Sequence, residues 1–154
     1  MARAKGPLYK LKITGLTEAE AFLQEIGDRS YNMKPVLMVI KEIMRKTSEG
    51  NFQSEGELIG HKWELDTPDT IEKKLASGYS NQTEVMEGNL YDSLTSIASG
   101  NGAVRRISRH STTFGTNLFY AHWQGHKREL LGITMFQADN FAERMIEYLV
   151  GGVA

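Results

Sequence analysis

The pattern that follows Pro35 constrains the fold of this chain more than any other feature. Apolar residues recur after it at intervals of three and four residues, which is the spacing of one face of an α-helix. They are Val36, Val39, Ile40, Ile43 and Met44. Proline is favoured in the first turn of a helix, because the N–H that it lacks would have no intrahelical partner there. We therefore predict an amphipathic helix that begins near Pro35, ends in residues 47–50 and buries this face.

Three other segments carry helix signals. Thr17 and Glu20 have the spacing of a capping box, in which each side chain bonds the backbone of the other residue. Thr67 and Pro68 match the N-cap and the first position of a second helix. Residues 138–150 form a third, which stops at a pair of glycines. The apolar faces expected on these helices are Ala19, Phe22, Leu23 and Ile26, then Ile71 and Leu75, then Phe141, Met145, Tyr148 and Leu149.

The remaining segments favour a small sheet. Residues 8–14 alternate apolar and basic side chains, as a half-buried edge strand does. Ser99-Gly100-Asn101-Gly102 forms a turn by its residue types, so we interpret the segments on either side, 88–97 and 103–111, as a β-hairpin. The first of these segments could also be a helix, because it is too short for its periodicity to decide.

These elements predict a single α+β domain over residues 1–154. It has a small, mostly antiparallel sheet packed with amphipathic helices, and the hairpin around Gly100 projects from it. The 154 residues and the hydrophobic content of 40% are enough for one core without disulfides. Phe52 and Trp63 are the expected aromatic anchors of a polar, glycine-rich loop.

Composition and charge exclude several functions. The chain has no cysteine, which excludes disulfides, thiolate metal sites and a cysteine nucleophile. Its basic start lacks the apolar segment of a signal peptide, and the longest aliphatic run, residues 36–40, is too short to cross a membrane. The net charge of −1 argues against a protein dedicated to nucleic acid. Because the chain lacks a signal peptide and a long aliphatic run, we expect no membrane association.

Two basic clusters stand out against this neutral background. Each could contact DNA or an acidic partner, or simply face solvent. They are Arg3, Lys5, Lys10 and Lys12, and Arg105, Arg106 and Arg109.

The histidines are the candidates for chemistry. His122 and His126 are four residues apart, so on a helix they share a face at metal-ligand spacing, and His110 precedes them. One interpretation is therefore a metal-assisted nuclease or hydrolase that uses His110, His122 and His126. No acidic residue completes a zinc-protease motif, and neither a nucleophile elbow nor a phosphate-binding loop is present. The other interpretation is an interaction protein without a cofactor, which binds through sheet edges, basic loops and aromatic anchors.

The order of four segments between Phe52 and Ile133 adds a further signal. The first joins Phe52, Gly60 and Trp63-Glu64-Leu65 to Thr67, Thr70 and Lys73-Lys74, and the second is Gly88-Asn89-Leu90-Tyr91-Asp92-Ser93-Leu94. The third joins Gly115-Thr116-Asn117 to Tyr120-Ala121, His122 and Gln124-Gly125, and the fourth runs from Arg128 to Gly132. In this order the segments resemble the phage virion morphogenesis family, the tail-completion, tail-terminator and head–tail joining proteins of tailed phages.

The resemblance implies a structural, non-enzymatic subunit of the virion. Such subunits form a ring, often a hexamer, at the tail end or neck, where it completes the tail and joins it to the head. The implied partners are further copies in head-to-tail contact, the tail tube protein and the head–tail connector proteins. Contact with DNA that passes through the ring would lack sequence specificity. The implied location is the virion, and the host cytoplasm during assembly.

The resemblance also suggests roles for particular residues. We expect the hairpin around Gly100, with Arg105, Arg106 and Arg109, to contact a neighbouring subunit or the tube protein. Tyr120 and Trp123 are expected to anchor the local core. The positions that match the family motifs are Trp63, Gly88, Leu90, Tyr120, Ala121, Gln124 and Gly125.

Overall fold

The computed structural model describes residues 15–79, 81, 88–98 and 100–152, without the side chains of residues 16, 126 and 127. This part of the chain is mostly helical with one two-stranded antiparallel sheet, so the predicted α+β class is confirmed. The elements are α1 (Leu16–Tyr31), α2 (Lys34–Gln53), the short 3-10 helix η1 (Glu57–Ile59), α3 (Pro68–Ala76), α4 (Asn89–Thr95), β1 (Ala103–Ile107), β2 (Thr112–Thr116), α5 (Ala121–Lys127) and α6 (Met135–Gly151). The strand predicted over residues 8–14 lies outside the described residues.

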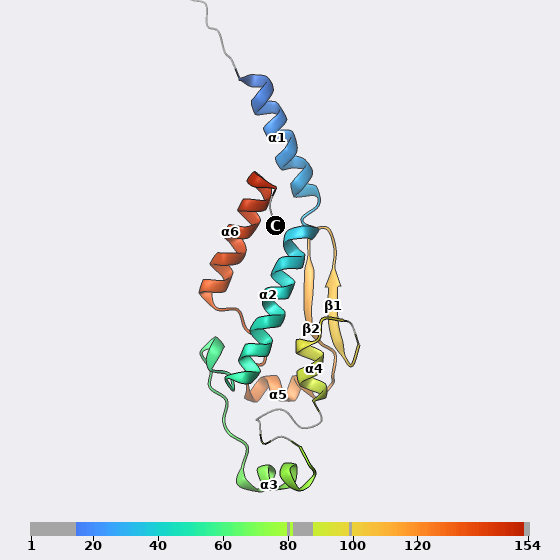
Figure 1. The fold of residues 1–154 in the computed structure, drawn as a ribbon, viewed down its shortest axis with the longest axis vertical. Helices are drawn as coiled ribbons and strands as arrows, with labels where there is room; N and C mark the ends of the chain where they lie inside the picture. Colours follow the sequence, from blue (N-terminus) through green and yellow to red (C-terminus); the bar gives the residue numbers. More distant parts are fainter. Residues whose placement is uncertain (1–14, 80, 82–87, 99, 153–154) are drawn as a thin grey trace, which may run out of the picture.

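Helix α2 is the axis of the molecule (Figure 1). Helix α6 lies along one side of it and the β1–β2 hairpin along the other, while α4 and α5 lie near its C-terminal end. Helix α1 extends beyond the end of α6, and α3 hangs from the opposite end of the molecule. The result is an elongated molecule whose two end helices stand away from the body.

The central prediction, a helix opened by Pro35, is confirmed. Val36 is fully buried and Ile40 is 4% exposed, on the face that the spacing indicated. The helix does not end at residues 47–50, however, but continues to Gln53. The hydroxyls of the polar residues in this stretch bond to carbonyls one turn back, so that they stay within the helix. The extension brings Phe52 into the core.

Two hydrophobic clusters lie along α2, one toward each end. The upper cluster consists of Val36, Leu37, Ile40 and Tyr148, with Met33, Met44, Ile107, Phe141 and Met145 packed against it. The lower cluster consists of Phe52, Trp63, Leu90, Leu94 and Leu130, with Tyr91, Leu118, Tyr120 and Ala121 packed against it. The Phe52 ring meets the Trp63 and Tyr91 rings edge to face, with centroids 5.2 and 5.4 Å away. The predicted anchoring role of Phe52 and Trp63 is confirmed.

A β-hairpin is present, but it lies further along the chain than predicted. Strands β1 and β2 pair with Arg105 opposite Phe114, and the turn between them runs from Ser108 to Ser111. The Ser108 N–H donates to the Ser111 carbonyl over 2.8 Å, and the two hydroxyls are 2.7 Å apart. Serine side chains close this turn. It has no glycine or proline, so its residue types carry no strong turn signal.

Gly100 is therefore not at the tip of the hairpin, which corrects the prediction. It lies before β1, at the open end, where its carbonyl accepts from the Ala103 N–H over 2.7 Å. The segment predicted as the first strand, around Leu90, is helix α4. Nor does the hairpin project from the body, since Ile107 on its inner face packs against the upper cluster.

The helix starts were predicted with mixed success. Helix α3 begins as predicted, with its N-cap threonine and first-turn proline. The capping box of Thr17 and Glu20 is wrong, because α1 starts earlier from Gly15, whose φ is 87°, without a side-chain cap. A capping box does exist at α6, between Thr134 and Gln137, and it starts that helix ahead of the predicted residue 138. None of the described helices is long and apolar enough to cross a membrane.

Only the C-terminal part of α1 is attached to the body. The Arg29 guanidinium donates to the carbonyls of Leu149 and Val150 at the end of α6, over 2.9 and 2.8 Å. Phe22 and Leu23, nearer the N-terminal end, are 45% and 66% exposed. The apolar face predicted for this helix is therefore present on α1, but the rest of the described chain does not bury it.

Candidate functional site

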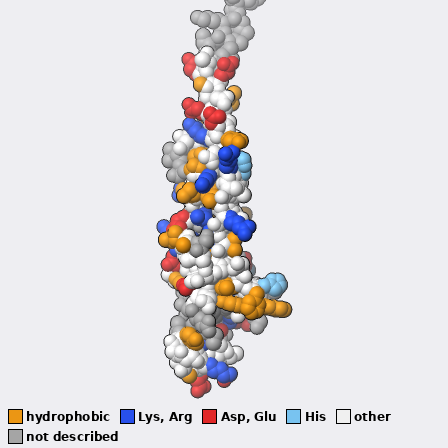
Figure 2. Space-filling view, turned by 90° about the vertical axis from the view of Figure 1, so that its right-hand side faces the viewer, with side chains coloured by type: hydrophobic (Ala, Val, Ile, Leu, Met, Phe, Trp, Pro, Cys, Tyr) orange, Lys and Arg blue, Asp and Glu red, His pale blue; other side chains and the backbone are white. Residues whose placement is uncertain are grey.

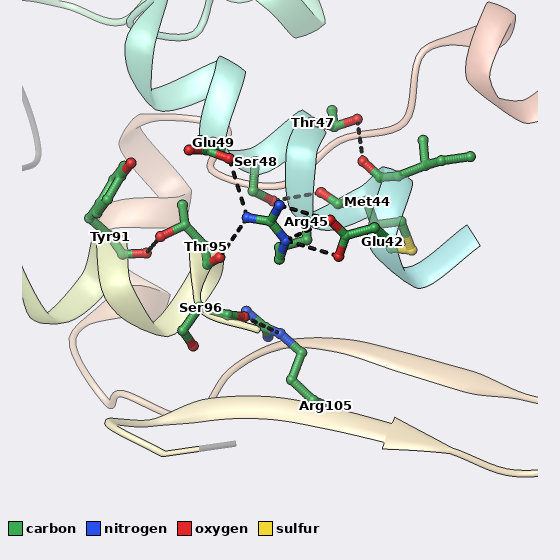
Figure 3. Close-up of polar contacts among 11 residues, drawn as sticks. Glu42, Met44, Arg45, Thr47, Ser48, Glu49, Tyr91, Thr95, Ser96 and Arg105 are labelled. Carbon is green, nitrogen blue, oxygen red and sulfur yellow. Dashed lines mark hydrogen bonds and ion pairs between the residues drawn. The ribbon is translucent and has the colours of Figure 1, made fainter. Parts of the chain in front are cut away.

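Arg105 points inward from β1 toward α4 and α2 (Figure 3). Its guanidinium donates to the carbonyls of Ser93 (2.8 Å), Ser96 (3.3 Å) and Gly115 (2.8 Å). It also lies 3.9 Å from the centre of the Phe114 ring. Carbonyls at the end of a helix carry partial negative charge, so a cation is stabilising there. Arg105 thus closes the C-terminal end of α4 from inside the fold.

Arg45 on α2 approaches the same end of α4. It donates to the Thr95 carbonyl over 2.9 Å and pairs with Glu42 (2.8 Å) and Glu49 (3.2 Å) (Figure 3). The hydrogen bond from Arg45 lowers the pKa of the Glu42 carboxyl and raises the pKa of Arg45 itself. Burial lowers the pKa of Arg105, and the positive charge of Arg45 lowers it further. The charge of Arg45 is therefore paired with two carboxylates, whereas the guanidinium of Arg105 is hydrogen-bonded to backbone carbonyls.

The other two arginines of the cluster face outward. Arg106 is exposed on the outer face of the hairpin, where Thr113 is its cross-strand partner. Arg109 lies in the turn, where it donates to the Tyr31 hydroxyl over 2.6 Å and stacks 4.8 Å above the Tyr31 ring. The sequence treated the three arginines as one cluster, but the structure divides them. A partner can be contacted through Arg106 and Arg109, while Arg105 is engaged within the fold.

The described histidines do not meet. His110 lies in the hairpin turn with its ring 6.2 Å from that of Tyr31, whereas His122 lies on α5, beyond the other end of the hairpin. The strands between them span about 17 Å. The side chain of His126 lies outside the described residues. Among those described, no three histidine, aspartate or glutamate side chains are grouped so as to hold a metal ion.

The motif positions of the sequence meet in the lower cluster. Trp63, Leu90, Tyr120 and Ala121 come from three separate segments and pack around one core. The Trp63 indole N–H donates to the Glu129 carbonyl over 3.1 Å, which adds the fourth segment. The four segments are thus parts of one packed core, and their order along the chain reflects how that core is built.

The remaining motif positions act through their backbone. Gly88 is the N-cap of α4, with a φ of 79° that favours glycine. Within α5, the Gln124 N–H donates to the Tyr120 carbonyl over 3.2 Å, and the Gln124 carbonyl accepts from the Arg128 N–H over 2.8 Å. Gly125 lines an open cleft beside α5.

Helix α5 and the residue before its cap expose an aromatic surface, which we call the α5 patch (Phe119, His122 and Trp123). Phe119 is 83% and Trp123 is 68% exposed, and the rings of His122 and Trp123 are 5.8 Å apart. Figure 2 shows hydrophobic side chains that jut from the body beside a histidine, near the lower end of the molecule. A cleft of about 480 Å³ adjoins the patch, lined by Phe119, His122 and apolar side chains of the lower cluster. Trp123 is therefore not the core anchor that we predicted, whereas Tyr120 packs against the core.

Comparison with known proteins adds no relative: no family model, curated protein or solved structure matches the chain. The function of the chain is therefore inferred from its own surfaces and from the order of its motifs.

Proposed function

We propose that this chain is a structural subunit of a tailed-phage virion. Copies of it assemble into a ring, expected to be a hexamer, at the tail end or neck, where the ring completes the tail and joins it to the head. Its partners are other copies, the tail tube protein and the head–tail connector proteins. It has no catalytic role and needs no cofactor.

The observation that carries this proposal is the apolar surface that one copy leaves uncovered. Among the described residues, sixteen large hydrophobic side chains are exposed, whereas nine hydrophobic residues are buried. Large exposed apolar patches are uncommon on soluble monomers and mark interaction sites. A ring subunit covers such surfaces with its neighbours.

Two further observations support the proposal. The four segments that resemble the phage family pack together around the lower cluster, as parts of one ancestral core would. Of the histidines that an enzyme would need, His110 and His122 lie at opposite ends of the hairpin. The shared packing of the four segments supports the resemblance to the phage family. The separation of His110 and His122 disfavours the metal-assisted enzyme.

The proposal is tested by the mass of the purified protein, measured by light scattering with and without tail tube protein. We expect a discrete oligomer, seen as closed rings in negative-stain images, that binds the ends of tail tubes. A protein that stays monomeric at all concentrations and ignores tail tubes would overturn the proposal. Stoichiometric bound metal, with hydrolysis lost in a His122→Ala/His126→Ala variant, would establish the enzyme instead.

A further inference from the structure

Helix α1 presents an apolar stripe that nothing in the described part of the same copy covers over its N-terminal half. The stripe consists of Ala19, Phe22, Leu23 and Ile26, which share one side of the helix by their spacing. Phe22 and Leu23 are the most exposed of its large side chains. Figure 1 shows the N-terminal half of α1 extending past α6. This half of the helix therefore has the form of an arm.

The arm is acidic. Helix α1 carries four acidic side chains and one basic side chain, a net charge of −3. The acids are Glu18, Glu20, Glu25 and Asp28. The one base, Arg29, is used within the copy, where it binds Glu25 and the end of α6. Glu18, Glu20 and Asp28 have no ion-pair partner among the described residues, and such carboxylates disfavour pairing of one α1 with another.

The hairpin presents the complementary surface. Its residues 103–116 hold no acid, and two of their three arginines, Arg106 and Arg109, are exposed. Figure 2 shows Lys and Arg side chains gathered at mid-height on this side of the molecule. Val104 and Arg106 of β1 face outward beside Thr113 and Gly115 of β2. A Cβ on Gly115 would meet no atom within 4 Å, so the space above it is open. A glycine on an exposed strand face permits close approach of another backbone.

The two surfaces cannot meet within one copy. The hairpin turn contacts Tyr31, at the C-terminal end of α1, through Arg109. Leu23 lies about 12 Å further along the helix, away from the sheet. We propose that the apolar stripe of α1 packs on the outer hairpin face of the next copy, with the α1 carboxylates around Arg106. This contact joins two different surfaces, as a ring formed by rotation requires, and it rests on the proposed function.

Cross-linking tests the contact directly. The chain has no cysteine, so introduced thiols report on contacts without background. Leu23→Cys places a thiol on the α1 stripe, and Thr113→Cys places one on the outer hairpin face. Oxidation with copper phenanthroline should convert the protein with both substitutions into a ladder of covalent multimers that ends at the ring. Each single variant should stay monomeric on a denaturing gel. A dimer from Leu23→Cys alone would show that α1 pairs with α1 and would overturn the inference.

Charge and polarity variants provide a second test. Leu23→Glu places a charge on the apolar stripe of α1, and Arg106→Glu reverses the charge of the outer hairpin face. Each variant should self-associate at least roughly tenfold more weakly. An equimolar mixture of the two proteins retains one working contact, so it should give a 1:1 dimer and nothing larger. Leu75→Glu on α3 is the matched control, since Leu75 is also an exposed helical leucine (58%). It should assemble like the unaltered protein.

The outcomes separate this inference from the proposed function. If the unaltered protein forms rings and both variants do so too, or if their mixture gives no dimer, the contact is wrong while the ring remains. If the unaltered protein is monomeric alone and on tail tubes, the ring and the contact both fail.

Discussion

Arg105 and Arg106 are neighbours on β1, but they lie on opposite faces of the hairpin, because successive side chains of a strand point to opposite sides. Arg105 donates to the carbonyls of Ser93 and Ser96 and so holds α4 against the sheet, whereas Arg106 faces solvent. The two residues have the same chemistry and adjacent positions. They therefore form a matched pair in which stability and assembly can be separated.

We expect Arg105→Gln to lower the free energy of unfolding by about 2–3 kcal/mol, because buried carbonyls lose a charged donor. Arg106→Gln should change it by no more than about 0.5 kcal/mol, as is usual for exposed positions. Urea unfolding followed by circular dichroism measures both. Equal losses in the two variants would contradict the inward role of Arg105.

Two glycines that flank η1 have similar backbone angles but different surroundings. Gly56 has a φ of 89° and Gly60 a φ of 91°. A Cβ on Gly56 would overlap the His61 carbonyl and the Trp63 indole, whereas a Cβ on Gly60 would meet nothing within 4 Å. The close approach at Gly56 lets the chain turn back so that Trp63 reaches the lower cluster.

Gly56→Ala should therefore destabilise the protein by about 3–4 kcal/mol, the sum of backbone strain and overpacking. Gly60→Ala should cost only the backbone term, about 1–2 kcal/mol. Thermal unfolding of the two variants, followed by near-ultraviolet circular dichroism of the tryptophan environment, compares them. If Gly60→Ala were the more damaging, the tight packing at Gly56 would be refuted.

At the scale of elements, a buried ion cluster joins α3 to the body. Lys74 on α3 donates to Asp66 over 2.6 Å, and Arg128 reaches the other oxygen of the same carboxylate over 3.3 Å. The side chains of Lys74 and Asp66 are only 5% and 10% exposed. Removing one partner of a buried ion pair is destabilising.

Asp66→Asn should loosen α3 without unfolding the core. A loss of roughly 3 kcal/mol at this cluster corresponds to roughly hundredfold faster hydrogen exchange of the α3 amides. Asp69→Asn is the control, because Asp69 pairs with Lys73 at the surface, where both side chains are more than 70% exposed. Exchange that accelerates equally in α2 would show that α3 is not an independent unit.

The elements could be predicted where local signals and the tertiary fold agree. Helix α2 could be predicted from Pro35 and the apolar spacing after it, and α3 from the cap at Thr67. Both signals are local, because proline and threonine act within one turn. The hairpin was misplaced because its turn from Ser108 to Ser111 depends on serine hydrogen bonds that local residue types do not indicate. With the strand pairing wrong, the inward direction of Arg105 could not be deduced.

The candidate interface was predicted only in part, for a physical reason. Arg106 and Arg109 are exposed, as an interface requires. The α5 patch was missed, because aromatic residues such as Trp123 are usually buried and were assigned to the core. A sequence pattern identifies an apolar face but not whether another part of the chain covers it. The exposed stripe of α1 illustrates the same limit.

At the scale of the whole molecule, the exposed apolar side chains include two groups that lie far apart. One is the α1 stripe at one end, and the other is the α5 patch toward the opposite end. The proposed contact places the first group on the hairpin of a second copy, whose exposed arginines are opposite in charge to α1. A ring made through α1 and the hairpin leaves the α5 patch free. Under the proposed function, the α5 patch therefore contacts a different virion component, with the tail tube protein as the test partner.

The two tryptophans allow these contacts to be observed separately. Trp63 is 3% exposed and Trp123 is 68% exposed, so acrylamide should quench the fluorescence of Trp123 and spare that of Trp63. We expect the quenching to persist when the protein self-associates and to fall sharply when tail tube protein is added, because only the second contact covers α5. A Trp123→Phe variant, which retains Trp63 alone, should resist quenching in both states. Protection of Trp123 on self-association alone would place α5 inside the ring contact, and the tube protein would then need another surface.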